Sequence, residues 1–224
     1  MVASGRQVHR RPGAVEAPKL HLVSSEQLYA LGIELMDKAD TSERTRKADA
    51  SRYRDGLIIA LLAVIPLRRR TLAALRIGDN LVKSGDLWLL DIAAKDINTR
   101  RVLEYPLSAQ LSARIDVYLE RFRGRIPGAT AHTGLWASNS ARLMTGGAIY
   151  DAVRKRTGQA FGIAIHLHRF RHAAATFWSI RDPANVRGAK DLLGQSTFGT
   201  TEKHYIMAQS RLAGRALARA IGRF

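Results

Sequence analysis

Apolar residues recur at helical spacing along most of the chain, which predicts a mainly helical protein. The first helix is expected over residues 24–40, because Ser24 can cap it and the apolar side chains that follow share one face. A polar connection over residues 41–50 is expected next. The strongly apolar helix that follows, over residues 53–65, should end at Pro66 and lie in the core.

Strand character is limited to two short segments in the middle of the chain. Residues 87–93 and 101–106 are rich in aliphatic side chains, and the polar turn 95–100 between them predicts a hairpin. Further helices are expected over residues 108–123, 146–161, 168–180, 182–193 and 210–221. The predicted fold class is therefore α+β and mainly α-helical, with a small antiparallel β-sheet.

The N-terminal residues 1–23 differ from the rest of the chain. They hold prolines, glycines and scattered basic residues without any period, which is typical of a flexible basic arm or linker. Residues 24–224 are expected to form one folded domain, since no composition break or internal repeat divides them.

The net charge of the chain indicates which class of molecule it binds. Among 224 residues, 36 Lys and Arg face 19 Asp and Glu, for a formal net charge of +17. Such an excess favours a polyanion as partner, although a merely soluble basic surface is the alternative. The absence of cysteine excludes a disulfide framework and thiolate metal sites. No apolar run approaches the roughly 20 residues of a membrane span, so a cytoplasmic protein without membrane contact is expected.

Two segments carry side chains suited to phosphate chemistry. The sequence PLRRRTLAAL, residues 66–75, places three arginines directly after the predicted buried helix. In HRFRHAAAT, residues 168–176, His168 and Arg171 lie three residues apart and so share one helix face. A guanidinium can hold two phosphate oxygens while an imidazole donates or moves a proton. Taken alone, either segment could equally be the solvated basic face of an amphipathic helix.

Two later segments complete an ordered series of sequence motifs. LLGQS, residues 192–196, and TTEKHY, residues 200–205, follow the arginine segment, the hairpin lysine and the H-x-x-R segment. In this order the segments resemble the tyrosine recombinases, also called phage integrases, from about residue 26 to the C-terminus. The resemblance implies the catalytic domain of a site-specific DNA recombinase or integrase of a mobile element. The helical core-binding domain that usually precedes that domain is expected to be absent.

The resemblance assigns a role to each matching residue. The implied catalytic residues are Arg68, Lys95, His168, Arg171, Gln195 and Tyr205. Tyr205 would attack the phosphodiester and form a 3′-phosphotyrosyl link, and Lys95 would protonate the leaving 5′ oxygen. A phenol with a pKa near 10 needs cations around it to ionise at neutral pH, which suits two arginines.

The family's chemistry also implies partners and a location. Double-stranded DNA is the expected partner, and no metal or other cofactor is required. Self-association as a tetramer on DNA and DNA-bending accessory proteins are further expectations. The C-terminal helix either docks onto a neighbouring subunit in this tetramer or packs on its own domain. The chain is expected to be bacterial or phage-encoded and associated with the nucleoid. Expected DNA contacts, beyond the catalytic residues, are Arg69, Arg70, Arg100, Arg101, His172 and Lys203.

Three departures from the family pattern keep other functions open. Gln195 stands where His or Trp is usual, Thr71 replaces an acidic residue, and Tyr205 follows Gln195 by one residue more than is common. A glutamine can donate a hydrogen bond but cannot carry a proton. The alternative function is therefore a catalytically impaired DNA-binding protein or accessory subunit with a recombinase-like fold. A topoisomerase-like relaxing activity would share the chemistry.

Overall fold

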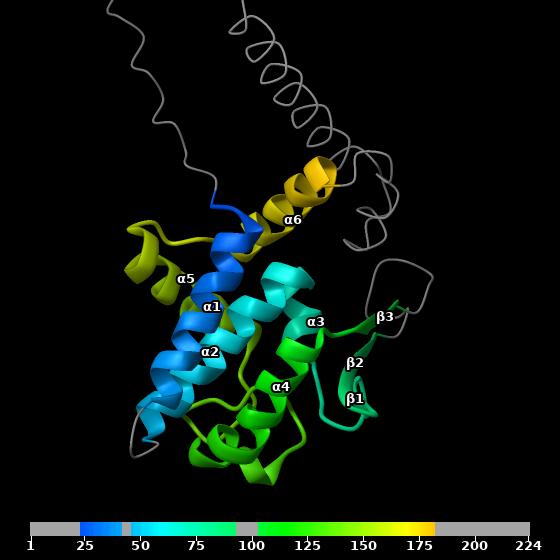
Figure 1. The fold of residues 1–224 in the computed structure, drawn as a ribbon. Coiled ribbons are helices and arrows are strands. Elements are labelled where there is room, and N and C mark those ends of the chain that lie inside the picture. Colours follow the sequence, from blue (N-terminus) through cyan, green and yellow to red (C-terminus); the bar gives the residue numbers. More distant parts are fainter. Residues whose placement is uncertain (1–22, 42–45, 93–102, 182–224) are drawn as a thin grey trace, which may run out of the picture.

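Six α-helices and one three-stranded sheet make up the part of the chain that the computed structural model describes, residues 23–41, 46–92 and 103–181 (Figure 1). The helices are α1 (Ser25–Asp40), α2 (Lys47–Val64), α3 (Arg69–Ala73), α4 (Ala109–Val117), α5 (Gly146–Phe161) and α6 (Leu167–Arg181). The strands are β1 (Leu81–Ser84), β2 (Leu87–Ile92) and β3 (Leu103–Pro106). Short π and 3-10 turns follow α4 at Tyr118–Phe122, Arg123–Arg125 and Ala129–Ala131.

Helix α1 begins and ends as its sequence predicts. The Ser24 hydroxyl accepts a hydrogen bond from the Gln27 backbone N–H at 3.3 Å, and the Gln27 side chain accepts one from the Ser24 N–H at 2.9 Å. This reciprocal pair satisfies two of the amide groups that a helix start leaves without partners. The prediction of a helix over residues 24–40 is therefore confirmed.

Helix α2 begins earlier than predicted, so the expectation of a polar connection through residue 50 is wrong from Lys47 onward. Asp49 supplies the reason, because its side chain accepts a hydrogen bond from the Arg46 backbone N–H at 3.1 Å. Polar residues in a first helical turn can satisfy the exposed amides there, so their polarity does not argue against a helix. The end of α2 before Pro66 is as predicted.

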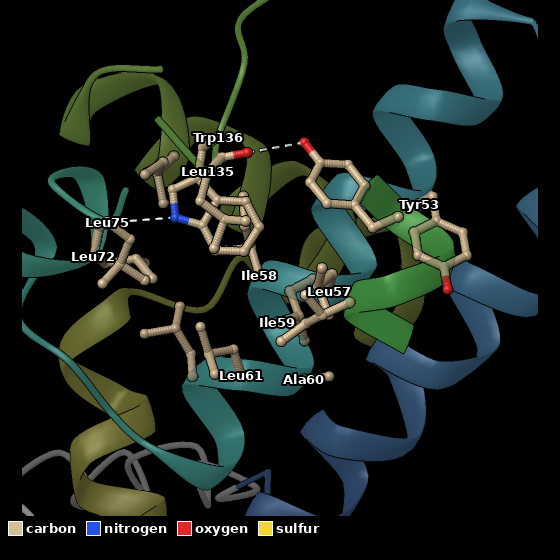
Figure 2. Close-up of a cluster of buried hydrophobic side chains, with 14 of the residues drawn as sticks. Tyr53, Leu57, Ile58, Ile59, Ala60, Leu61, Leu72, Leu75, Leu135 and Trp136 are labelled. Atoms are coloured by element: carbon tan, nitrogen blue, oxygen red, sulfur yellow. Dashed lines mark hydrogen bonds between the residues drawn. The ribbon is translucent and has the colours of Figure 1, made fainter. Parts of the chain in front are cut away.

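Helix α2 is the centre of the fold. It contacts α1, α4, α5 and α6, and its residues from Leu57 to Leu62 are at most 1% exposed. Figure 2 shows this cluster, in which α2 side chains pack near Leu72, Leu75 and Trp136. The Trp136 indole N–H donates to the Leu72 carbonyl at 2.9 Å, so the one polar atom of this ring is also satisfied inside the core.

Two glycines allow α1 and α2 to approach closely. A Cβ atom on Gly56 would lie 2.7 Å from the Gly32 carbonyl oxygen, and one on Gly32 would lie 2.7 Å from the Gly56 carbonyl oxygen. Because each obstacle is backbone, neither could move aside for an added methyl group. The two helices therefore run side by side at a separation that these glycines set (Figure 1).

The sheet contains the predicted hairpin and one strand more. Strands β2 and β3 pair antiparallel, as expected, but β1 also pairs antiparallel with β2 and makes the sheet three-stranded. The turn between β1 and β2 is tight, with Ser84 opposite Leu87 and Gly85 at a φ of +57°. Only Leu81 of β1 is buried, so this strand lacks the alternation by which a strand is recognised in sequence.

Some of the remaining predicted helices are confirmed, and others are not tested. Helix α4 starts after Ser108, whose hydroxyl accepts from the Leu111 N–H at 3.3 Å, and α5 has the predicted bounds. Helix α6 matches the prediction to within one residue at each end. The helices expected over 182–193 and 210–221 lie outside the described residues, as does the arm over residues 1–22. None of the described helices has the length and apolarity to cross a membrane.

A buried arginine without an acidic partner lies beside a histidine at the far end of α4. Arg123 is 9% exposed and donates through Nη2 to the carbonyls of His132 (2.7 Å) and Gly134 (2.8 Å). No ion pair between described residues involves it. Burial and the nearby charge of Arg123 lower the pKa of His132 from its ordinary value of 6.5. The folded protein therefore favours neutral His132.

Gly56→Ala should lower the free energy of unfolding. The gain in helix propensity, about 1 kcal/mol, opposes a backbone clash, and overpacking of this kind costs about 1–3 kcal/mol and more where nothing can yield. Gly158→Ala in α5 is the matched control, since its Cβ would meet nothing nearer than 3.8 Å. Thermal unfolding should show a lower Tm for Gly56→Ala and an equal or higher Tm for Gly158→Ala. Equal Tm values for the two would contradict the close contact.

The stability of the protein should fall as pH drops below the ordinary pKa of His132. Because its folded pKa is lowered, the unfolded chain binds more protons in this range, and stability is full above about pH 6.5 and lost downward from there. Denaturant unfolding of wild type and His132→Asn between pH 7.5 and about pH 5 measures the effect. The variant should lose less stability on acidification, and parallel curves would refute the assignment.

Candidate active site

The end of α2 positions the first predicted catalytic arginine. After Val64 the chain turns, with the Leu67 N–H donating to the Ile65 carbonyl at 2.7 Å, and buried Pro66 prevents the helix from continuing. Arg68 then stands at the start of α3 in an extended conformation, with φ −67° and ψ 146°. Its side chain is half-buried.

Helix α6 brings the second predicted arginine to the same place. Arg171 Nη1 donates to the Pro66 carbonyl oxygen at 2.6 Å, across 105 residues of sequence. Phe170 and Ala174, which are 0% and 3% exposed, bury the inner face of the helix and so fix its rotation. The two arginine segments identified in the sequence thus meet at the end of α2.

The electrostatics confirm that the two arginines are neighbours. Burial lowers the pKa of Arg171, and the charge of Arg68 lowers it further. An arginine stays protonated despite such shifts, so two positive charges are held near one another. Arg68 forms no ion pair with a carboxylate among the described residues. An anion bound here would relieve the repulsion between the two guanidinium groups.

The sheet contributes a third side to the site. Tyr105 on β3 is half-buried and lies near enough to Arg171 to raise its pKa, against the lowering caused by burial and Arg68. Strand β3 is paired with β2, and residues 93–102, which include Lys95, connect the two strands. Lys95 itself lies outside the described residues, and its role stays a prediction.

His168 stands in the first turn of α6 with an exposed side chain. The His172 ring lies edge-on to it, with ring centroids 4.3 Å apart and an interplanar angle of 84°. His172 is half-buried, so it supports the His168 ring from the turn below as well as being a predicted DNA contact. The two rings thus contact each other on the helix that also carries Arg171.

The basic residues next to Arg68 differ in environment. Arg69 and Arg70 are exposed on α3, as a DNA contact requires, whereas Thr71 between them and the core is 7% exposed. Arg69 also packs with its aliphatic stem against the start of α5, because a Cβ on Gly146 would lie 2.9 Å from Arg69 Cγ. This residue therefore has a structural role that its charge alone does not suggest.

The other half of the predicted site is untested. The structure brings Arg68 and Arg171 together and places His168 and His172 on the helix that carries Arg171. The residues outside the described ranges are Lys95, Arg100, Arg101, Gln195, Lys203 and Tyr205.

Sequence reasoning missed two groups at the site. The Pro66 carbonyl is a backbone atom, and no residue pattern shows which side chain will reach it. Tyr105 could have been suspected from its place in a strand that follows the lysine turn, but its approach to Arg171 depends on how the sheet meets α6. The bond to Pro66 fixes the Arg171 guanidinium at the end of α2, and a planar guanidinium suits a bidentate acceptor such as a phosphodiester.

Comparison with known proteins finds one matching family model and several solved structures with a similar fold. The family model described as the phage integrase family matches residues 33–211, which is most of the chain. Among curated proteins no sequence match is found.

Solved structures share the fold. The XerH site-specific recombinase, in a post-cleavage complex bound to a palindromic difH substrate, matches with a TM-score of 0.59 and 17% identity over 84% of this chain and 51% of that one. The XerA recombinase matches with a TM-score of 0.62 and 15% identity over 92% of this chain and 66% of that one. The chain thus spans less than two thirds of either relative, and at these identities the likeness shows the fold: a mainly helical tyrosine recombinase catalytic domain with a small antiparallel sheet.

Arg171→Ala should destabilise the protein through the end of α2. The buried Pro66 carbonyl would lose its hydrogen bond, which costs about 1–3 kcal/mol for an unsatisfied group. Arg169→Ala is the control, because Arg169 is exposed on the same helix and its loss should stay within about 0.5 kcal/mol. Urea unfolding at neutral pH measures both. Equal stabilities for the two variants would show that the bond to Pro66 contributes nothing.

Proposed function

The chain belongs to the phage integrase family, and we propose that it is a site-specific DNA recombinase that cuts and rejoins strands through a covalent phosphotyrosine. We propose the catalytic activity, DNA as the substrate, and the identity of the residues that react. Its natural setting would be the bacterial or phage nucleoid in the cytoplasm.

One observation carries the proposal: Arg68 and Arg171, distant in sequence, lie together at the end of α2, and the helix that carries Arg171 also carries the exposed His168. Two guanidinium groups can hold the two non-bridging oxygens of one phosphodiester. They also neutralise the charge that grows on those oxygens in the transition state, which is usually the largest catalytic contribution.

The first chemical step follows from these residues and the predicted ones. The phenolic oxygen of Tyr205 gives up its proton, with His168 assisting, and attacks the scissile phosphorus. The bond from phosphorus to the 5′ oxygen breaks, and Lys95 gives that oxygen a proton. Gln195 donates a hydrogen bond to the phosphate. The products are a 3′-phosphotyrosyl link and a free 5′ hydroxyl.

The second step reverses the first with a different strand. A 5′ hydroxyl of the partner duplex attacks the phosphotyrosine, and Tyr205 leaves with its proton restored. Each phosphodiester broken is replaced by another phosphate ester, so the reaction needs no external energy source. Double-stranded DNA is the proposed partner, with a tetramer on DNA and DNA-bending proteins as further parts of the proposal.

A second candidate has its own support. Gln195 stands where His or Trp is usual, and Thr71, at the position of an acidic residue, is buried on α3. A protein so altered could bind DNA through the two arginines yet cleave it slowly or not at all. The proposed enzyme and this inactive binder differ in whether a covalent link to DNA forms.

Covalent trapping distinguishes the two candidates. The full chain is incubated with labelled, nicked duplexes that cover the ends of its genetic element, then denatured and separated by size. Wild type should give a protein band that carries label, and Tyr205→Phe should give none because the nucleophilic oxygen is gone. Tyr29→Phe is the matched control, since it removes only a surface hydrogen bond to Gln110, and it should leave the band unchanged.

The variant Gln195→His decides how a missing band is interpreted. If wild type binds the duplexes without a link, and the histidine raises adduct formation about tenfold or more, proton transfer at position 195 limits the enzyme. If wild type and Gln195→His both bind without forming a link on any duplex of the set, the inactive binder replaces the recombinase as the function.

A further inference from the structure

A tyrosine and a histidine outside the predicted catalytic set form a pair next to α6. The Tyr150 hydroxyl on α5 lies 2.6 Å from Nδ1 of His166, the residue that precedes α6. The two rings are 5.6 Å apart between centroids and tilted by 52°. Tyr150 is half-buried while His166 is exposed, so the tyrosine is the fixed member and the histidine faces solvent.

A cation completes the pair. The Arg154 guanidinium lies over the Tyr150 ring, 5.4 Å from its centroid, one helical turn along α5. Its Nε is buried and has no hydrogen-bond partner in the described part of the chain. No described carboxylate forms an ion pair with Arg154 either. The surroundings of the pair are therefore positive, which favours an anionic ligand over a basic one.

The hydrogen bond decides which nitrogen of His166 can bind that ligand. A neutral imidazole has one N–H and one acceptor nitrogen, and the partner of one nitrogen fixes the state of the other. When the Tyr150 hydroxyl donates to Nδ1, the hydrogen of the ring is on Nε2. An exposed imidazole held in this state is a neutral donor in a fixed orientation, suited to a phosphate oxygen.

The place of the pair along the chain relates it to the reaction. His166 precedes His168 by two residues and Arg171 by five, on a helix that Arg171 ties to Pro66. Helix α5 also relates the pair to the arginine segment, because Tyr150 lies one helical turn after Gly146, where an added Cβ would be 2.9 Å from Cγ of Arg69, the residue that follows Arg68.

We propose that the Tyr150–His166 pair is a phosphate-binding site for the DNA strand next to the scissile phosphate. Tyr150 is a positioning residue in it, because it acts by fixing the imidazole of His166. The inference rests on the proposed function for the identity of the ligand, since the adjoining phosphate belongs to the cleaved strand. What it adds is a second, uncharged contact that sets the register of DNA on α6.

The test measures binding of the full chain to a labelled duplex of arbitrary sequence at pH 8, over a series of salt concentrations. His166→Ala should weaken binding about tenfold, as expected for a lost hydrogen bond to a charged group. The slope of log affinity against log salt should not change, because a neutral donor releases no counterion. His166→Gln should restore part of the affinity, since its amide can donate, and Tyr150→Phe should weaken binding less than His166→Ala.

Controls separate this contact from general loss of structure. Tyr29→Phe removes a comparable phenol hydrogen bond on α1 and should bind as wild type does. All variants should unfold at the wild-type temperature. Equal weakening by Tyr29→Phe, or wild-type affinity for His166→Ala, would overturn the inference. A salt slope reduced by about one in His166→Ala would overturn the neutral-donor assignment.

The covalent-trapping experiment tests the recombinase proposal and the phosphate-site proposal separately. If wild type forms the Tyr205-dependent link while His166→Ala binds duplex normally, the phosphate site is refuted and the recombinase stands. If neither wild type nor Gln195→His forms any link but His166→Ala binds duplex about tenfold more weakly than wild type, catalysis is refuted and the phosphate contact is supported. A wild-type chain that binds no duplex at all would refute both.

Discussion

The end of helix α2 is the constraint on which the site depends. Helix α2 is buried over most of its length, and a backbone carbonyl that is buried at its end needs a partner within the protein. Pro66 stops α2, and the guanidinium of Arg171 satisfies its carbonyl at 2.6 Å. The same bond fixes α6 beside the start of α3. A structural requirement of the core thereby places Arg171 next to Arg68.

The rest of the core holds α2 in the position that this bond needs. On one side, the backbone contact between Gly32 and Gly56 sets the distance to α1. On another, the buried carboxylate of Asp55 accepts from Arg54 at 2.7 Å and from Arg156 on α5 at 3.0 Å. Arg54 also donates to the Ala137 carbonyl at 2.6 Å, which fastens the loop before α5. The polar groups around Asp55 thus connect elements that are distant in sequence.

Charge is distributed differently at the site than in the core. Asp55 balances the buried arginines around it, whereas Arg68 has no acidic partner among the described residues and its charge lowers the pKa of Arg171. Grouping cations without neutralising them opposes folding, and the arrangement becomes favourable when an anion binds. Beside the Tyr150–His166 pair, Arg154 on α5 likewise has no ion pair with a described carboxylate. The net charge of +17 is thus partly concentrated where a phosphate backbone would be held.

The sequence by itself predicted most of the described helices, the β2–β3 hairpin and the two arginine segments that meet at the end of α2. Capping at Ser24, the proline after α2 and the H-x-x-R spacing depend on neighbours within a few residues, so local patterns were enough to predict them. Local patterns did not predict the start of α2 or the presence of strand β1. Polar residues in a first helical turn, and a strand with one buried side chain, show little hydrophobic periodicity. Only the tertiary structure decided that Arg171 meets the Pro66 carbonyl, that Tyr105 approaches it from the sheet and that Tyr150 fixes His166. These contacts join residues that are close only after folding, and the packing of α5 and α6 around one buried helix is what brings them within reach.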